Sequence, residues 1–363
     1  MKRVHTYPDL FTHRRESVLP ETVQRLTHDL GMAVQSRTVS PTLVSAFRAA
    51  LRDVPAEAVP RAAAEIRDVG QMFAWHLDTK TTGAESQLLH MIGLARKTPD
   101  SLLREHPDLG WFFMFHGSGY LRQAAMEALP TSPDSPFEVA AVVYRMNDWV
   151  ENVRAASRVY AKKFLPSSDA RTISEAAFFL IHQATLFGRW TDTSRSVVLE
   201  NIYREDVLAR LKEQFLAARS GKIGRSLSLI LRRSDFDGYL RDLVMDADSP
   251  IVRAIAADTL LTKRARWHVG HRREWVNKAL GVARRVPTFE SRVVTIDIPV
   301  MDVLTAAMND KSAQVRRTAA DYLVANRYSL TPEMMVFRDR LSTDKSPAIR
   351  FRMDFLNRSL AES

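Results

Sequence analysis

The chain of 363 residues contains no cysteine. That absence excludes disulfide bonds, thiolate zinc sites and a cysteine nucleophile, and it fits a reducing compartment. Long apolar runs are lacking too, because the longest, Ala176–Phe187, is interrupted by His182 and Gln183 and is too short to cross a bilayer. The first eight residues lack the apolar core of a signal peptide. We therefore expect a cytoplasmic protein that does not enter a membrane.

Patterns typical of β-strands are nearly absent. Only residues 293–300 have the composition of extended chain, and we expect them to join two helices. Helix starts are frequent by contrast, since a Ser or Thr cap followed by Pro at the first helical position occurs repeatedly. In one case the Glu138 side chain, three residues after Ser135, completes a capping box. The sequence predicts an all-α fold with helices that open at Ser40-Pro41, Ser135-Pro136, Ser249-Pro250, Thr331-Pro332 and Ser346-Pro347.

One short pattern recurs along the chain. Asp310–Leu323 and Asp344–Leu356 each contain an Asp, an aliphatic residue five positions later, an Arg directly after it and a helical apolar stripe. The two aliphatic residues, Val315 and Ile349, are 34 positions apart. Related copies occupy residues 148–159 and 246–260, and a weaker copy without the Asp occupies residues 119–129. Self-similarity at such a period indicates stacked helix pairs, each packing an apolar face on its neighbour.

The pattern resembles that of the HEAT/armadillo-type repeat family, whose second helix carries an Asp…Val-Arg…Ala-Ala…Leu motif. The resemblance implies an α-solenoid, a single curved array over residues 20–363 that follows a basic N-terminal arm at residues 1–19. It implies a fold and does not name a function. The clearest helix pairs are expected at residues 136–164, 236–262, 300–325 and 331–360.

The arginine of each copy has two interpretations. In the first, it pairs with an Asp of its own or the adjacent copy and forms an internal ladder. In the second, it lines a groove and contacts phosphates, which suit the planar fork of donors on a guanidinium. These arginines are Arg122, Arg154, Arg253, Arg316 and Arg350. The aromatic run Trp111–Phe115 is expected to form core.

Positive charge is concentrated in one part of the chain. The formal net charge is +10 and the pI is about 9.9, a balance that favours a polyanionic partner. Residues 219–285 hold fifteen Lys and Arg against seven Asp and Glu. Within them, Lys263–Arg273 has five Lys or Arg, two His, Trp267 and no acid.

Cations interleaved with indoles suit a nucleic-acid groove, since the cations hold the backbone and the rings stack on bases. The other interpretation of Lys263–Arg273 is a solvated loop with Trp267 as a packing plug. The predicted nucleic-acid contacts are Arg232, Arg233, Lys263, Arg264, Arg266, Trp267, Arg272, Arg273, Arg284, Arg285, Arg316 and Arg317.

Motifs for metal binding or catalysis are few in the sequence. His268 and His271 have no third ligand nearby, so we predict no metal site and no cofactor. Some HEAT-like folds are DNA glycosylases of the alkylpurine type, and the chain resembles them as a basic helical array. That resemblance implies a carboxylate framed by tryptophans, yet the expected place before Arg154 holds no acid. The candidates that remain are Asp192 and Asp148, whose ordinary roles would be an N-cap and a turn residue.

Two functions therefore stay open. The first is an α-solenoid that binds nucleic acid, most simply DNA, with base excision as a subordinate hypothesis. The second is a non-enzymatic interaction module, an adaptor or an inhibitor or immunity protein for an acidic partner. A basic cluster dispersed on a convex face would favour the second over the first.

Overall fold

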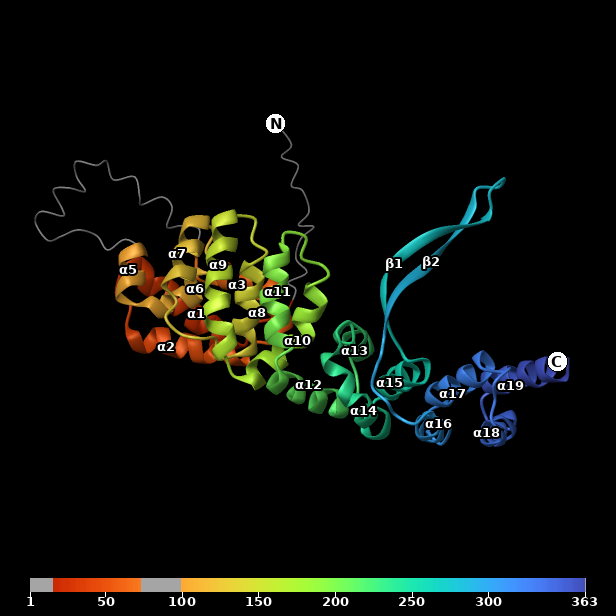
Figure 1. Cartoon of the computed structure of the whole chain (residues 1–363). Helices are drawn as coiled ribbons and strands as arrows, with labels where there is room; N and C mark the ends of the chain where they lie inside the picture. The colour runs from red at the N-terminus through yellow and green to blue at the C-terminus, as the bar shows by residue number, and fades with distance from the viewer. Residues whose placement is uncertain (1–15, 73–98, 363) are drawn as a thin grey trace, which may run out of the picture. The chain divides into compact units, whose positions relative to one another are not determined.

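The computed structural model describes residues 16–72 and 99–362. These residues are mostly helical and carry one small antiparallel sheet, so the all-α class is confirmed. They group into two compact units: unit 1 holds the residues up to Thr172 together with Phe187–Val198, and unit 2 holds Ile173–Leu186 and the residues from Leu199 onward (Figure 1). Most of the predicted basic arm, residues 1–15, lies outside the described residues. No helix in the described ranges is long and apolar enough to span a bilayer.

Unit 1 is built from short helices. The α-helices are α1 (Glu21–Ser36), α2 (Pro41–Ala50), α3 (Val59–Val69), α5 (Pro99–Glu105), α6 (Gly110–Phe113), α7 (Gly119–Ala128), α8 (Pro136–Arg145), α9 (Glu151–Phe164) and most of α11 (Asp192–Ile202). Single 3-10 turns connect some of them, namely η1 (Leu51–Asp53), η2 (Ala56–Ala58), η4 (Pro107–Leu109) and η5 (Leu165–Ser167).

Unit 2 adds the sheet to a second set of helices. Its elements are most of α10 (Ala170–Gln183), then α12 (Glu205–Ala217), α13 (Ile223–Ile230), η6 (Ser234–Tyr239), α14 (Leu240–Asp246), α15 (Pro250–Thr262), β1 (Arg264–Asn277), β2 (Val282–Val293), α16 (Val300–Met308), α17 (Ala313–Ala325), α18 (Pro332–Ser342) and α19 (Pro347–Ala361).

Each predicted Ser-Pro or Thr-Pro start opens a helix. The Ser40 and Ser135 hydroxyls accept hydrogen bonds from the N–H groups of Leu43 and Glu138, as N-caps do. The reciprocal half of the predicted capping box differs, because the Glu138 carboxylate accepts from the Asp134 N–H at 2.8 Å rather than from the cap residue. The same Glu138 carboxylate also accepts hydrogen bonds from the Arg48 guanidinium.

The aromatic run forms the core of unit 1, as predicted. Trp111 and the three residues after it are fully buried, and Phe115 is 2 % exposed. The ring of Phe47 on α2 meets that of Phe112 edge-on, with 5.5 Å between centroids. The apolar pattern of the sequence is sufficient to place this core.

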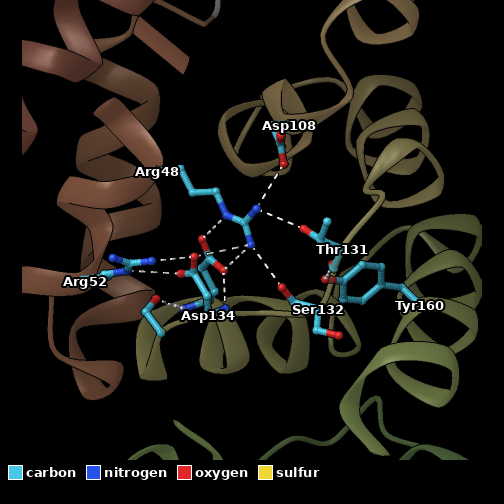
Figure 2. A network of polar contacts seen from close by, with 9 residues as sticks. Arg48, Arg52, Asp108, Thr131, Ser132, Asp134 and Tyr160 are labelled. Atoms are coloured by element: carbon cyan, nitrogen blue, oxygen red, sulfur yellow. Dashed lines mark hydrogen bonds and ion pairs between the residues drawn. The ribbon is translucent and has the colours of Figure 1, made fainter. Parts of the chain in front are cut away.

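A polar network stands beside it (Figure 2). The Arg48 guanidinium donates to Glu138 at 2.9 Å, to Asp108 at 3.1 Å and to the Thr131 hydroxyl at 2.9 Å. Burial raises the pKa of Glu138 to about 7, against the opposing effect of Arg48. The Tyr160 hydroxyl donates to the Thr131 carbonyl at 2.6 Å, and burial raises its pKa as well. Because these groups satisfy one another, we regard the network as a structural anchor between α2, α8 and α9.

In unit 2, alternate helices pack on one another. Along one series, α13, α15, α17 and α19 are neighbours in turn, and α12, α14, α16 and α18 form the other series. The predicted apolar stripe makes these contacts, since Val315, Ala319, Ala320 and Leu323 of α17 are all buried. The small alanines permit close approach of the helices.

The β-hairpin corrects the expectation that strands are nearly absent. β1 and β2 pair antiparallel from Arg264↔Val293 to Asn277↔Val282, with irregularities at His268/Gly270 and Trp275/Asn277. Residues 294–299 form a connection without regular structure, but it joins β2 to α16 rather than two helices as expected, and Val293 and Val300 belong to those two elements. The sequence pattern did not predict the hairpin, because most of its side chains are exposed on both faces. Such a ribbon lacks the alternation of apolar and polar residues by which half-buried strands are recognised.

Candidate nucleic-acid interface

The base of the hairpin is fixed to the helices of its own unit. The Arg292 guanidinium donates to the Leu231 carbonyl at 2.8 Å and forms a second, two-pronged contact with the buried Asp237 carboxylate. Ala265 is fully buried, and the Val294 N–H donates to the Lys263 carbonyl at 2.9 Å. Beyond this base the two strands run clear of the helices of unit 2 (Figure 1). The position of the rest of the ribbon is therefore set by the pairing of its own strands.

The register sorts the side chains into two faces. In an antiparallel pair, directly opposite residues point to the same face and alternate positions to opposite faces. One face, here called the cation face, contains the pairs Arg264/Val293, Arg266/Ser291, His268/Phe289, His271/Pro287, Arg273/Arg285 and Trp275/Ala283. None of these described side chains is acidic.

The opposite face, here called the paired face, holds both acids of the hairpin. Glu274 lies directly across from Arg284 and accepts from its Nε at 3.0 Å. Glu290 accepts a hydrogen bond from the Trp267 indole N–H, also at 3.0 Å. Both carboxylates are thus engaged on the paired face, and neither of them compensates the positive charge of the cation face.

The cation face places like charges directly opposite each other. Arg273 and Arg285 are directly opposite each other, and like charges at such positions destabilise a sheet. Within the described residues, no ion pair is found for Arg264, Arg266, Arg273 or Arg285. An anion placed along this face would be attracted by both strands at once.

Aromatic rings lie between these cations. Trp275 is 44 % exposed, and the Arg273 guanidinium stands 4.1 Å from its ring centroid. Phe289 is 51 % exposed beneath Arg266, at 5.3 Å. Trp267, the ring selected from the sequence, lies instead on the paired face, half-buried, with Arg232 at 5.5 Å over it. The sequence did not predict Phe289 or Trp275 as stacking rings, because only the strand register shows which rings share a face with the arginines.

The other predicted contacts lie in helices and connections of unit 2. Lys263 follows α15 as its C-cap residue, and its Nζ donates to the Ile296 carbonyl at 3.0 Å. Arg233 stands 4.4 Å over the Tyr203 ring and pairs with Asp235 at 3.2 Å. The structure therefore brings together on the hairpin Arg264, Arg266, Arg272, Arg273, Arg284 and Arg285, while Arg232, Arg233, Arg316 and Arg317 belong to helices or their ends.

Three of the five arginines of the recurring pattern pair with an Asp as the ladder interpretation predicts, whereas Arg154 pairs with Glu151 and no ion pair of Arg350 is found among the described residues. Arg253 binds Asp310 and Arg316 binds Asp344, each at 2.6 Å, and Arg122 binds Asp148 at 2.8 Å. In each case the Asp belongs to the next copy along the chain. In all five copies Nη1 also donates to the carbonyls six and five residues earlier. A phosphate contact by Arg316, which was also predicted, would have to displace Asp344.

The two candidate catalytic carboxylates lie in different surroundings of unit 1. The Asp148 side chain is 1 % exposed and accepts from both Arg122 and Arg145. Burial by itself would raise the pKa of Asp148, but the Arg122 hydrogen bonds and the Arg145 charge outweigh it and lower that pKa. Asp192 is fully exposed at the first position of α11, and Thr191, rather than Asp192, provides the N-cap oxygen. Their catalytic role stays a prediction.

The two hairpin histidines contact each other, with 4.7 Å between ring centroids. Across the described ranges, no group of three or more His, Asp or Glu side chains is placed to hold a metal ion. No model of a known protein family matches the chain, and no curated protein matches it.

Proposed function

We propose that the protein binds nucleic acid, most simply duplex DNA, along the cation face of the β-hairpin. The observation that carries the proposal is the separation of charge: Arg273 opposes Arg285 on a face without acids, while Glu274 and Glu290 are confined to the other face. A fold gains nothing from two opposed, unpaired arginines, whereas a phosphate backbone supplies their counter-charge.

The shape of the element supports the same conclusion. A two-stranded β-ribbon is one of the elements that the major groove of B-DNA admits. The cations of this face are all arginines, whose planar donors suit phosphate oxygens. Exposed Trp275 and Phe289 provide rings for stacking where bases are accessible.

We further propose that the helices form a HEAT-like solenoid that carries the hairpin. Support comes from the alternate packing of the helices in unit 2 and from the Arg-to-Asp links between successive copies. In this arrangement the ladder arginines hold the array together and leave the hairpin arginines to bind the ligand.

The test compares two variants that lose the same charge. Arg273→Gln with Arg285→Gln removes the opposed pair, and Arg340→Gln with Arg358→Gln removes two exposed arginines from α18 and α19. Affinity for a labelled duplex of about 20 base pairs is measured by fluorescence anisotropy between about 50 and 200 mM salt. We expect the hairpin variant to lose at least tenfold in affinity and to lower the salt slope by about 2, with little change in the control.

Equal losses in both variants would show that the chain attracts DNA only through its net charge. Absence of salt-dependent binding by the natural protein would overturn the proposal and favour an acidic protein partner. Alkali treatment of the bound DNA, followed by analysis for strand breaks, tests the subordinate hypothesis of base excision. Breaks that disappear in Asp192→Asn, or in an Asp148→Asn variant that keeps the unfolding temperature and DNA affinity of the natural protein, would assign the catalytic carboxylate.

A further inference from the structure

A pocket of about 230 Å³ opens at the foot of the hairpin. It is lined by helices α13, α15 and α17 and by one hairpin side chain, Arg266. Its wall combines Ile251 and Ile255 with the polar groups of Asp258, Arg317 and Asp321. The pocket is smaller than those that hold drug-sized ligands, and its size suits one small planar group between apolar and polar walls.

Asp258 is the unusual member of this wall. It is half-buried, and burial raises its pKa while the charge of Arg266 lowers it in part. Its side chain makes no hydrogen bond and no ion pair with any described residue, whereas Asp321 is held by Arg352 and stands 3.9 Å from Arg317. A carboxylate that is partly removed from water without an N–H donor is unfavourable. The Asp258 carboxylate can therefore accept hydrogen bonds from the N–H groups of a ligand in the pocket.

Arg266 links the pocket to the cation face, because it lines the pocket and belongs to that face. The same side chain lines a second hollow of about 320 Å³ at the ribbon, together with Arg264, Phe289 and Glu290, and the Glu290 carboxylate is engaged there by the Trp267 indole N–H. A phosphate held by Arg264 and Arg266 would bring its nucleoside next to Asp258. Because Asp258 repels phosphate, it suits a different part of a nucleic acid, namely the N–H groups on the edge of a base.

We infer that this pocket is a nucleobase subsite, which takes one unpaired base from the strand held on the cation face and binds its N–H edge through Asp258. Guanine fits best, because its Watson–Crick edge presents adjacent ring and amino N–H donors to the two carboxylate oxygens. Thymine offers one N–H between two carbonyl oxygens, which the carboxylate repels. These edges are free only when the base is out of its pair. The inference depends on the proposed DNA binding and adds the substrate feature that the site selects.

The test uses duplexes of about 20 base pairs that carry a single unpaired guanine or a single unpaired thymine in the same context. The natural protein is compared with Asp258→Asn and with Asp354→Asn, which removes an exposed carboxylate from α19. We expect the natural protein and Asp354→Asn to bind the bulged guanine about tenfold more tightly than the bulged thymine. Asp258→Asn should lose this preference, keep its affinity for the uninterrupted duplex and unfold at no lower temperature.

Equal affinity of the natural protein for the two bulges would overturn the subsite, and so would an Asp258→Asn variant that still prefers guanine. In either case, salt-steep binding of the uninterrupted duplex would leave the proposed function standing. If the natural protein binds none of the duplexes with a salt dependence, both proposals fall together.

Discussion

Arginine occurs in two contrasting settings in this protein. In the ladder, Arg122, Arg253 and Arg316 each bind an Asp of the next copy and two backbone carbonyls. On the cation face of the hairpin, Arg273 and Arg285 stand opposite each other in solvent without an acid. The sequence shows the same residue type in both settings.

Burial and local pairing distinguish the structural arginines from those available to a ligand. A buried guanidinium must be matched locally, because an unpaired charge in the interior is strongly destabilising. An exposed one can stay unmatched at little cost, since water screens it. The unmatched arginines are therefore those free to bind an external anion. Substitutions that exchange the properties of the ladder and the hairpin test this distinction.

The largest expected effect comes from breaking the ladder where it is most buried. Arg122→Ala should lower the free energy of unfolding of unit 1 by about 3–5 kcal/mol, because it leaves the buried Asp148 carboxylate without two of its four hydrogen bonds. Denaturant unfolding followed by circular dichroism measures the loss.

Arg273→Ala on the hairpin is the matched control and should leave unfolding unchanged within about 0.5 kcal/mol. A comparable loss in both variants would mean that the hairpin arginine is also structural. The triple variant Arg122→Met, Arg145→Met and Asp148→Leu should recover much of the stability, because it removes the three buried charges together.

Acidification should weaken the ladder through its carboxylates. The Arg316 hydrogen bond lowers the pKa of Asp344, and for Asp310 the Arg253 hydrogen bonds outweigh burial and lower its pKa too. A folded-state pKa below the unfolded value means that the stabilisation is present above about pH 4 and is lost as the pH falls through the folded pKa. The thermal unfolding midpoint of unit 2 should drop steeply below that pH.

Asp344→Asn should be less stable than the natural chain at pH 7 and should show a shallower decline in acid. A decline as steep as that of the natural chain would assign the acid sensitivity to other carboxylates.

The smallest expected effect comes from giving the hairpin a matched pair. Arg285→Glu places a carboxylate opposite Arg273 and should stabilise the ribbon by about 0.2–1 kcal/mol, while it weakens DNA binding. Slower hydrogen exchange of the β2 amides would report the gain. Arg284→Glu, on the paired face, puts two acids opposite each other and should speed the same exchange.

Most of the helical framework could be predicted from local sequence. The Ser-Pro and Thr-Pro pairs predicted to start helices do start them, because the cap oxygen and the fixed φ of proline act within one turn. The ladder was among the predictions because its Asp and Arg recur at fixed spacing. The basic cluster at Lys263–Arg273 was located, but its placement on a strand was not.

The amino-acid sequence by itself determined the helix starts, the aromatic core and the place along the chain where positive charge accumulates, because each depends on neighbouring residues. Tertiary structure alone decided that Arg266, Arg273 and Arg285 share one face, and that Asp258 lies beside the first of them. Strand pairing and helix packing join residues far apart in the chain. In an exposed ribbon, apolar and polar residues do not alternate, so the sequence pattern does not indicate the strand register.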